Sequence, residues 1–505
     1  MDDFSPAQKI KMENYVSYLI TGLILATTIL LFYMKRQLTY WKKRNVPYLE
    51  PTFPFGNLDN PIANKKSTGI QFKDFYDQFK KMGVKCGGVY AYVVPILVPA
   101  DVEVNKHILV KDFQHFHSRG FYSNGKDQPV SVNLFTIDGE KWRSLRAKFT
   151  PTFTSAKMKV MFELMLIASK TMESHLQEHA AKKTPLNIKD CVSRMTTNII
   201  GSCAFGIECN SFKDTRFYKL LRNIVDGTTV SLKLAFCNAL PEIAQMLRIP
   251  LFPVNETNSI CHSIEETIAY RNEKKVSRND FLQMLMEMKS NDVVDMDELK
   301  GQCVLFFLAG FETSATTMTF MFYELARNQD IQDKLRKEIN EVLLKHDNQI
   351  SYEAVMSMKY LEMVMCETLR MYPPLPILNR TCVKDYKLPN SDIVIEKGTR
   401  ILLPILAFHH DPEYFPEPNK FDPERFSDEN KSKIQPYSYL PFGEGPRNCI
   451  GDRFGKQQVR VGVASAIRKY KFKLNPKVKL PLEYTTSIVT TSTVDILLDV
   501  EEIKV

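Results

Sequence analysis

The chain has 505 residues, of which 44% are hydrophobic and 25% are charged, and its formal net charge is +9 at pH 7. These are ordinary values for a globular protein with a sizeable core, and scattered lysines and arginines without runs do not indicate nucleic-acid binding. A basic face for an acidic partner or an anionic membrane is favoured instead, and 10 irregularly spaced cysteines favour a reducing compartment over a disulfide framework.

An apolar segment near the N-terminus predicts a membrane anchor. Tyr15 to Met34 is a run of 20 residues without a charge, which is long enough to cross a bilayer as a helix. Basic residues follow it from Lys35 to Arg44 and predict a cytoplasmic body. A cleaved secretory signal is the competing interpretation. It is disfavoured because the run exceeds the usual apolar core of such signals and no small-residue cleavage site ends it.

The chain divides into three predicted regions. Residues 1–36 form a signal anchor or transmembrane segment, residues 37–60 a proline-containing linker, and residues 61–505 one large domain. The prolines stiffen the linker because the residue before each of them is restricted to extended geometry. No Gly/Ser-rich or acidic linker divides the remainder of the chain.

Helical periodicity dominates the large domain. Apolar residues recur at helix spacing in residues 157–178, 295–344 and 352–371. Strand-like stretches are short, and they occupy residues 88–98, residues 393–406 and parts of the C-terminal segment. We therefore predict a mainly α fold with small β-sheets.

The helix that begins near Asp295 has an unusual middle. Asp295 and Glu298 form a capping-box-like pair at its start. Glu312 is the only charged residue among the 23 between Lys300 and Glu324. A second membrane span is the competing interpretation, but a carboxylate in mid-span costs about 3 kcal/mol, and several threonines add polarity. We predict a helix buried in the protein, where the Glu312 carboxylate needs a partner or a chemical task.

The sequence Ala309-Gly310-Phe311-Glu312-Thr313 suggests that task. Ala309 and Gly310 leave room for a ligand against the helix, and Glu312 with Thr313 can pass protons through water to that space. The alternative is that the Thr313 hydroxyl only bonds the backbone of its own helix, as threonines in helices often do.

The segment Phe442-Gly-Glu-Gly-Pro-Arg-Asn-Cys-Ile-Gly451 predicts a pocket for one metal-bound thiolate. Helix-forming residues follow Cys449, and a helix N-terminus or a metal lowers the pKa of a cysteine. The glycines let the backbone approach a flat ligand, and Phe442 can cover the sulfur. No Cys or His lies nearby at zinc spacing, whereas a single axial thiolate is one known way to hold haem iron. A buried structural cysteine is the alternative, which the glycines and Arg447 disfavour.

The complete motif Phe-x-x-Gly-x-Arg-x-Cys-x-Gly resembles the haem-binding loop of the cytochrome P450 monooxygenases. The segment around Glu312 resembles the oxygen-binding kink of the same family, in which an acid and an alcohol assist O–O bond cleavage. Segments 200–212 and 415–421 resemble the insect microsomal branch, which is related to vertebrate drug-oxidising enzymes. The resemblance covers nearly the whole chain, and no expected motif is missing. It implies a cytochrome P450 fold with an N-terminal transmembrane helix.

The resemblance also assigns roles to individual residues. It implies haem b with the Cys449 thiolate as its axial iron ligand, and Thr313 and Glu312 as catalytic residues. Further cofactor-binding residues are implied at matching family positions: Arg119, Trp142, Arg146, Ala309, Arg380, Phe442, Arg447 and Gly451. Ordinary surface charge stays the alternative for Arg119. Glu367, Arg370 and Arg425 look like the Glu-Arg-Arg structural network of the family, although most glutamate–arginine pairs at such spacing are minor surface bridges.

The activity implied is that of a membrane-bound haem-thiolate monooxygenase, with residues 61–505 as its catalytic domain. It would insert one oxygen atom of O2 into lipophilic substrates, either xenobiotics such as plant toxins and insecticides or endogenous lipids and hormones. By analogy the substrate pocket draws on apolar segments at residues 121–135, 210–255, 306–313, 375–378 and 485–489. A haem-thiolate isomerase or dehydratase, and a non-catalytic haem sensor, are the alternative functions.

Electrons must come from a partner, because the sequence contains no Rossmann fingerprint or flavin motif. The implied partner is a diflavin NADPH-cytochrome reductase on the endoplasmic reticulum membrane, with cytochrome b5 as a second candidate donor. A basic docking face would be formed by Lys141, Arg143, Lys148, Arg453, Lys456 and Arg460, because opposite charges speed association. A solvated helix face is the alternative for each of these residues.

Overall fold

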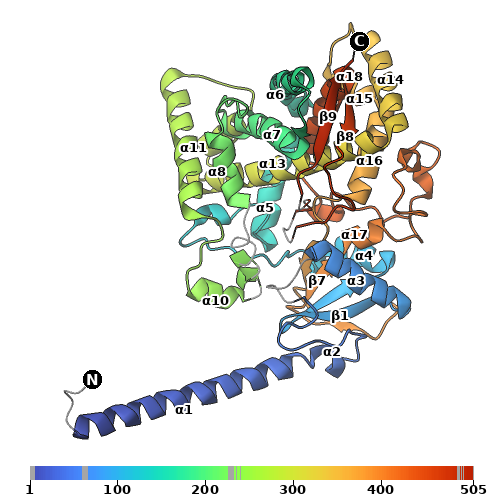
Figure 1. Cartoon of the computed structure of the whole chain (residues 1–505). Helices are drawn as coiled ribbons and strands as arrows, with labels where there is room; N and C mark the ends of the chain where they lie inside the picture. The colour runs from blue at the N-terminus through green and yellow to red at the C-terminus, as the bar shows by residue number, and fades with distance from the viewer. Residues whose placement is uncertain are drawn as a thin grey trace.

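The computed structural model describes residues 6–59, 66–225, 233–234, 236–238, 240–485, 489–490, 492 and 494–503, with side chains from residue 14 onward. Helices make up most of this part of the chain, and the strands form small sheets at its periphery (Figure 1). The predicted mainly α class with small β-sheets is confirmed.

The first half of the chain contains helices α1 (Pro6–Gln37), α2 (Tyr40–Lys43), α3 (Thr68–Lys81), α4 (Val102–Lys106), α5 (Gly139–Phe149), α6 (Ser155–Lys182), α7 (Ile188–Phe205), α8 (Arg216–Val225) and α10 (Pro241–Met246). The second half contains α11 (Val254–Lys274), α12 (Phe281–Ser290), α13 (Met296–Arg327), α14 (Gln329–Leu344), α15 (Tyr352–Ser357), α16 (Lys359–Met371), α17 (Ile405–His409) and α18 (Asp452–Lys469).

The described strands form three sheets. One has the order β1-β2-β7-β4, another β3-β9-β8, and the third pairs β5 with β6. The strands are β1 (Cys86–Ala91), β2 (Val94–Pro99), β3 (Leu186–Asn187), β4 (Leu378–Thr381), β5 (Tyr386–Lys387), β6 (Val394–Ile395), β7 (Arg400–Leu403), β8 (Tyr470–Leu474) and β9 (Leu497–Glu502). Strand β4 pairs antiparallel with β7, which brings Arg380 opposite Ile401.

Helix α13 crosses the middle of the helical body and packs along α7 and α18 (Figure 1). Its first turn has the predicted capping box, in which the Asp295 side chain accepts from the Glu298 N–H and the Glu298 side chain accepts from the Asp295 N–H. Most of its residues are buried, so the prediction of a helix inside the protein is confirmed. The periodic stretch 295–344 is broken at Asn328, where α13 ends and α14 begins.

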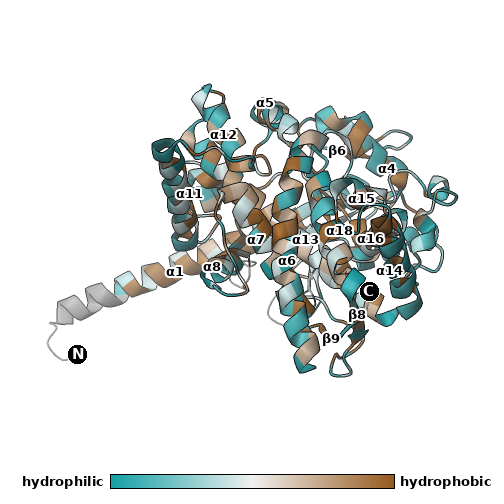
Figure 2. Cartoon of the chain, turned by 90° about the horizontal axis from the view of Figure 1, so that it is seen from above, coloured by the Kyte–Doolittle hydropathy of each residue, from teal (hydrophilic) through white to brown (hydrophobic). Residues whose placement is uncertain are grey.

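Helix α1 projects from the body and is apolar and exposed. Within residues Asn14–Gln37 the most apolar stretch of 18 residues has a mean hydropathy of 2.0, and none of those 18 residues is buried. Figure 2 shows apolar residues in two places, around the central helices and along α1. Burial explains the first group, whereas the apolar side chains of α1 have the length and composition to cross a bilayer.

The segment that follows α1 is packed against the body. Trp41 in α2 is only 1% exposed, and its indole N–H donates to the Val89 carbonyl at 3.1 Å. Arg44 pairs with Glu396 at 2.7 Å. This part of the predicted linker therefore lies on the sheet that contains β1, which restrains the direction in which α1 leaves the body.

Candidate functional site

The cysteine loop, residues 442–451, contains a short 3-10 turn, Gly445–Arg447, and ends at the start of α18. The Cys449 N–H donates to the Phe442 carbonyl at 2.8 Å, which closes the loop. Gly445 has a φ of +73°, and a Cβ there would lie 2.0 Å from the Leu109 carbonyl oxygen. The loop therefore needs this glycine for its own backbone and for the close approach of a neighbouring segment.

Cys449 is accessible at its surface but lies deep among surrounding protein atoms. Burial raises the pKa of Cys449, although the Gly451 N–H and the Arg119 and Arg146 cations act in the opposite direction. The expectation that a helix N-terminus lowers this pKa is wrong for the protein alone, because α18 begins at Asp452 and burial has the larger effect. A coordinated metal would deprotonate the thiol outright.

Four arginines from separate segments, Arg119, Arg146, Arg380 and Arg447, gather at the cysteine loop. Arg146 in α5 donates to the Asn448 carbonyl at 3.0 Å and to the Asn448 side-chain oxygen at 2.8 Å. Arg119 donates to the Arg447 carbonyl at 3.1 Å. The Arg447 guanidinium lies over the Trp142 ring at 4.3 Å and donates to Asp138 at 2.7 Å.

The same arginines have more buried donors than the protein satisfies. Among the described residues, Arg380 Nε and Arg447 Nε and Nη1 are buried without a hydrogen-bond partner. Burial, together with the nearby Arg447 cation, lowers the pKa of Arg380 to about 9. Burial also lowers the pKa of Arg447 to about 10, despite Asp138. Burial and three neighbouring arginines hold the pKa of Arg119 well below its ordinary value.

Such a cluster fits a flat group that carries two carboxylates. Buried polar groups in folded proteins are normally hydrogen-bonded, and guanidinium groups match carboxylates well. The two propionates of haem would supply acceptors for the free donors of Arg380 and Arg447 and would offset the repulsion between the arginines. The residues present therefore fit the cofactor expected from the sequence.

The middle of α13 lies close to the start of α18. The Gln458 side-chain amide of α18 donates to the Gly310 carbonyl at 3.4 Å and to the Ser314 hydroxyl at 3.2 Å. Ala309 is exposed although most of α13 is buried. Thr313, one turn further on, donates its hydroxyl to the Ala309 carbonyl at 2.5 Å. The backbone bond considered as an alternative for Thr313 is thus present.

Glu312 is turned toward another helix. Its Oε1 lies 3.0 Å from the Nζ of Lys189 in α7. Sequence analysis did not find Lys189, because a contact across more than a hundred residues leaves no local pattern. It also missed Asp138, which accepts from the Ser118 hydroxyl and from Arg447 and directly precedes α5. An aspartate before a predicted helix start was a usable signal for this residue.

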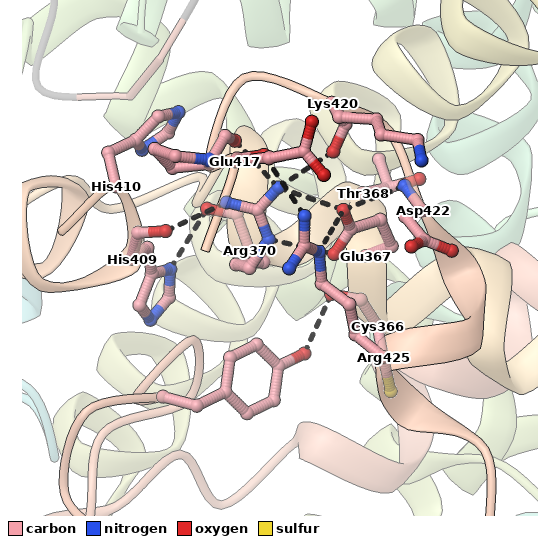
Figure 3. Close-up of polar contacts among 12 residues, drawn as sticks. Cys366, Glu367, Thr368, Arg370, His409, His410, Glu417, Lys420, Asp422 and Arg425 are labelled. Atoms are coloured by element: carbon pink, nitrogen blue, oxygen red, sulfur yellow. Dashed lines mark hydrogen bonds and ion pairs between the residues drawn. The ribbon is translucent and has the colours of Figure 1, made fainter. Parts of the chain in front are cut away.

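Glu367, Arg370 and Arg425 come together in one network of polar contacts (Figure 3). Arg370 makes a two-pronged pair with Glu367 at 2.7 and 2.8 Å, and both side chains are 0% exposed. Arg425 lies 3.4 Å from Glu367. Arg370 also donates to the carbonyls of His409 and Pro418, each at 2.8 Å. These contacts tie α16 to the segments that precede the cysteine loop.

The basic residues expected at a docking face are partly paired. Lys456 lies 3.2 Å from Glu362, and Arg460 pairs with the same carboxylate. Arg143 pairs with Glu140 at 2.6 Å. The predicted docking face therefore carries fewer unpaired positive charges than its number of lysines and arginines suggests.

Comparison with known proteins gives a consistent result. A family model described as Cytochrome P450 matches residues 61–499. The chain is 39% identical over 486 residues to cytochrome P450 6a8 of Drosophila melanogaster, covering 93% of this chain and 96% of that protein. It is 38% identical over 507 residues to cytochrome P450 6A1 of Musca domestica, covering 97% and 99%. Cytochrome P450 6a2 of Drosophila melanogaster is 38% identical, covering 96% and 99%.

Proposed function

Because the chain belongs to the cytochrome P450 family, we propose that Cys449 is the axial ligand of its haem and that its substrates are lipophilic molecules. Membership of this family makes the protein a haem-thiolate monooxygenase whose electrons originate from NADPH. The observation that best supports the proposed site is the convergence of four arginines, two of which have unsatisfied buried donors, on the loop that carries the one exposed cysteine of the described chain.

The proposed haem contacts divide by chemistry. The arginine donors and Trp142 would hold the propionates, while Phe442 and Gly451 would flank the sulfur and Ala309 would face the ring. When bound, haem supplies the redox-active iron at which O2 is activated. The protein contributes a desolvated sulfur, a fixed ring position and a small residue, Ala309, on α13 that leaves space beside it.

Arg380 provides a test of the propionate assignment. We expect Arg380→Gln to speed haem loss about tenfold or more, because a hydrogen bond to a charged group contributes about 1.5–3 kcal/mol. Haem transfer to an excess of a scavenging globin measures this rate. The exposed arginine Arg143, paired only with Glu140, is the matched control for a Gln substitution. Equal haem loss from the two variants would contradict the assignment.

Substitution of Arg380 should stabilise the haem-free chain, although it weakens the retention of haem. The native pKa of Arg380 is lowered from its ordinary value to about 9, so between these two values the unfolded chain holds more protons. Stability of the haem-free chain therefore rises with pH across this window, and the full penalty is present at neutral pH. We expect haem-free Arg380→Gln to unfold at higher urea concentration than the haem-free wild type at pH 7.

Thr313 and Glu312 are proposed to deliver protons beside the haem. Thr313→Ala should retain haem but divert reducing equivalents from product to hydrogen peroxide, because the hydroxyl that orders water on this face is lost. Peroxide formed per NADPH consumed measures the effect. The control is Thr319→Ala, because Thr319 bonds the Ala315 carbonyl at 2.7 Å in the same way but is buried. If Thr313→Ala and Thr319→Ala had equal effects, the Thr313 hydroxyl would serve only to bond the backbone of its own helix.

Apolar side chains support a lipophilic substrate. Phe121 and Phe135 pack with ring centroids 4.9 Å apart, and Phe153 stacks on Phe306 at 5.1 Å. Of the segments expected to line the pocket, residues 226–232, 235, 239 and 486–488 lie outside the described residues.

We further propose that the protein is anchored in the endoplasmic reticulum membrane with its body on the cytoplasmic side. Its electron donor would be a diflavin reductase, with cytochrome b5 as a second donor. Besides α1, the apolar residues Ile243, Met246 and Leu247 in and just after α10 are exposed. Helix α10 lies at the lower edge of the body, where α1 also leaves it (Figure 1). Both features support contact with a bilayer.

The function is tested by reconstitution of the full chain with reductase, NADPH and lipid. A panel of plant toxins, insecticides, fatty acids and ecdysteroids is screened for substrate-dependent consumption of O2 and NADPH and for oxygenated product. Monooxygenation requires all three to rise together. Turnover of a peroxide without NADPH would instead indicate an isomerase or dehydratase.

A further inference from the structure

Glu312 and Lys189 form a largely buried ion pair between two packed helices. Their Oε1 and Nζ atoms are 3.0 Å apart, and the side chains are 7% and 19% exposed. Glu312 lies in the middle of α13, and Lys189 is the second residue of α7. Because α7 packs along α13, this pair is fixed by the helix packing itself.

The position of Lys189 is unfavourable for a lysine by itself. The N-terminus of a helix carries a partial positive charge, which repels a cation in the first turn. The other groups at this end follow the usual preference, because Asn187 caps the helix and Asp190 lies in its first turn. Asp190 is paired with Arg194 at 2.7 Å and accepts from Tyr218, so its carboxylate is engaged elsewhere. The attraction of Glu312 therefore offsets the repulsion at Lys189.

The pair also sets the direction of the Glu312 side chain. Ala309 and Thr313 are separated by four residues and share one face of α13. Glu312 lies about 100° around the helix axis from Thr313, and Lys189 draws its carboxylate toward α7. The carboxylate is thus held away from the face on which Thr313 lies.

We infer that Lys189 is a positioning residue that controls the proton-delivery role of Glu312. This inference rests on the proposed function of Glu312 and Thr313. Proton transfer between Glu312 and the Thr313 face requires the ion pair to loosen, so Lys189 sets how readily the carboxylate becomes available. Without Lys189, a buried carboxylate loses its partner and turns toward the accessible face near Ala309.

The ion pair is tested first without reference to turnover. In urea unfolding of the full-length holoenzyme, Lys189→Met and Glu312→Gln should each lower the midpoint. The double variant should unfold no earlier than the less stable single variant, because the second change removes no further interaction. Strictly additive losses would overturn the pairing of these two residues.

The positioning role is tested by electron partition and solvent isotope effect. Lys189→Met should change the ratio of product to peroxide and the solvent deuterium isotope effect on product formation, and Lys189→Arg should restore both toward wild type. In the Glu312→Gln background Lys189→Met should change neither. The control is Lys300→Met, because Lys300 on α13 is a similarly covered lysine paired with Glu265 at 2.7 Å.

The outcomes distinguish the positioning role of Lys189 from the proposed proton delivery by Glu312 and Thr313. If Lys189→Met acts equally with and without Glu312→Gln, or if Lys300→Met has the same effect, Lys189 does not act through Glu312. If Glu312→Gln alters the partition but Lys189→Met does not, only the positioning role is overturned. If neither Glu312→Gln nor Thr313→Ala alters it, the proposed proton delivery itself is wrong.

Discussion

Replacement of Cys449 by serine is expected to abolish monooxygenase activity and the thiolate signature of the ferrous carbon monoxide complex. As the proposed axial ligand, the sulfur would donate electron density to the haem iron, and a serine hydroxyl at the same place would be a much weaker electron donor. The surrounding loop does not depend on the sulfur, because its closing bond runs from the Cys449 N–H to the Phe442 carbonyl. The variant should therefore fold, and difference spectroscopy on the purified protein measures the loss.

Cys261→Ser is the matched control. Cys261 is a partly exposed thiol on α11, remote in sequence from the cysteine loop. It should retain the thiolate signature in full. If Cys449→Ser kept the spectrum of the wild type, the iron ligand would be another residue, and the proposed arginine contacts to the propionates would need to be reassigned as well.

Local patterns were sufficient to predict the elements that carry this site. The capping box at Asp295, the long helix that follows with Glu312 as the one charge in its middle, and the helix that begins just after Cys449 are each encoded within about ten to thirty neighbouring residues. Such features depend on helix periodicity and end signals, which the sequence states directly. The breaks at Asn328 and Met358 were missed because apolar periodicity continues across both positions.

The ion pairs were less predictable because they depend on distant residues. Basic residues near Cys449 were expected to be available to a partner, yet Lys456 and Arg460 are both paired with Glu362 from α16. Lys189 was not considered at all, although it is the partner that the buried Glu312 requires. A charged residue that is predicted to be buried needs a partner, but only the packing of the folded chain identifies which residue that partner is.

The pKa of Cys449 shows the same dependence on packing. A helix start after the cysteine favours the thiolate, and this local feature was correctly located. Desolvation acts in the other direction and has the larger effect. Its size depends on how the loop packs against distant segments such as α5, whose Arg146 contacts Asn448, and no local segment of the sequence determines this packing.

The Glu367–Arg370 pair holds α16 against the region before the cysteine loop. Glu367 accepts from Arg370 through both oxygens and from the Asp422 N–H at 2.9 Å. Arg370 holds the His409 carbonyl, and the His409 ring in turn accepts from the Leu440 N–H at 2.9 Å, two residues before Phe442. Figure 3 shows Arg370 between Glu367 and His409. The network thus connects α16 to the cysteine loop by a short chain of hydrogen bonds.

We expect Glu367→Gln to lower the free energy of unfolding by about 3–5 kcal/mol, because it leaves a fully buried guanidinium without its counter-charge. Urea unfolding measures the loss, and the yield of haem-bound protein should fall with it. The matched control is Glu353→Gln, which breaks the exposed pair with Lys159 and should cost about 0–1 kcal/mol. If both variants lost the same small amount of unfolding free energy, the carbonyls of His409 and Pro418 alone would satisfy Arg370. The Glu367–Arg370 network would then not be what holds the cysteine loop in place.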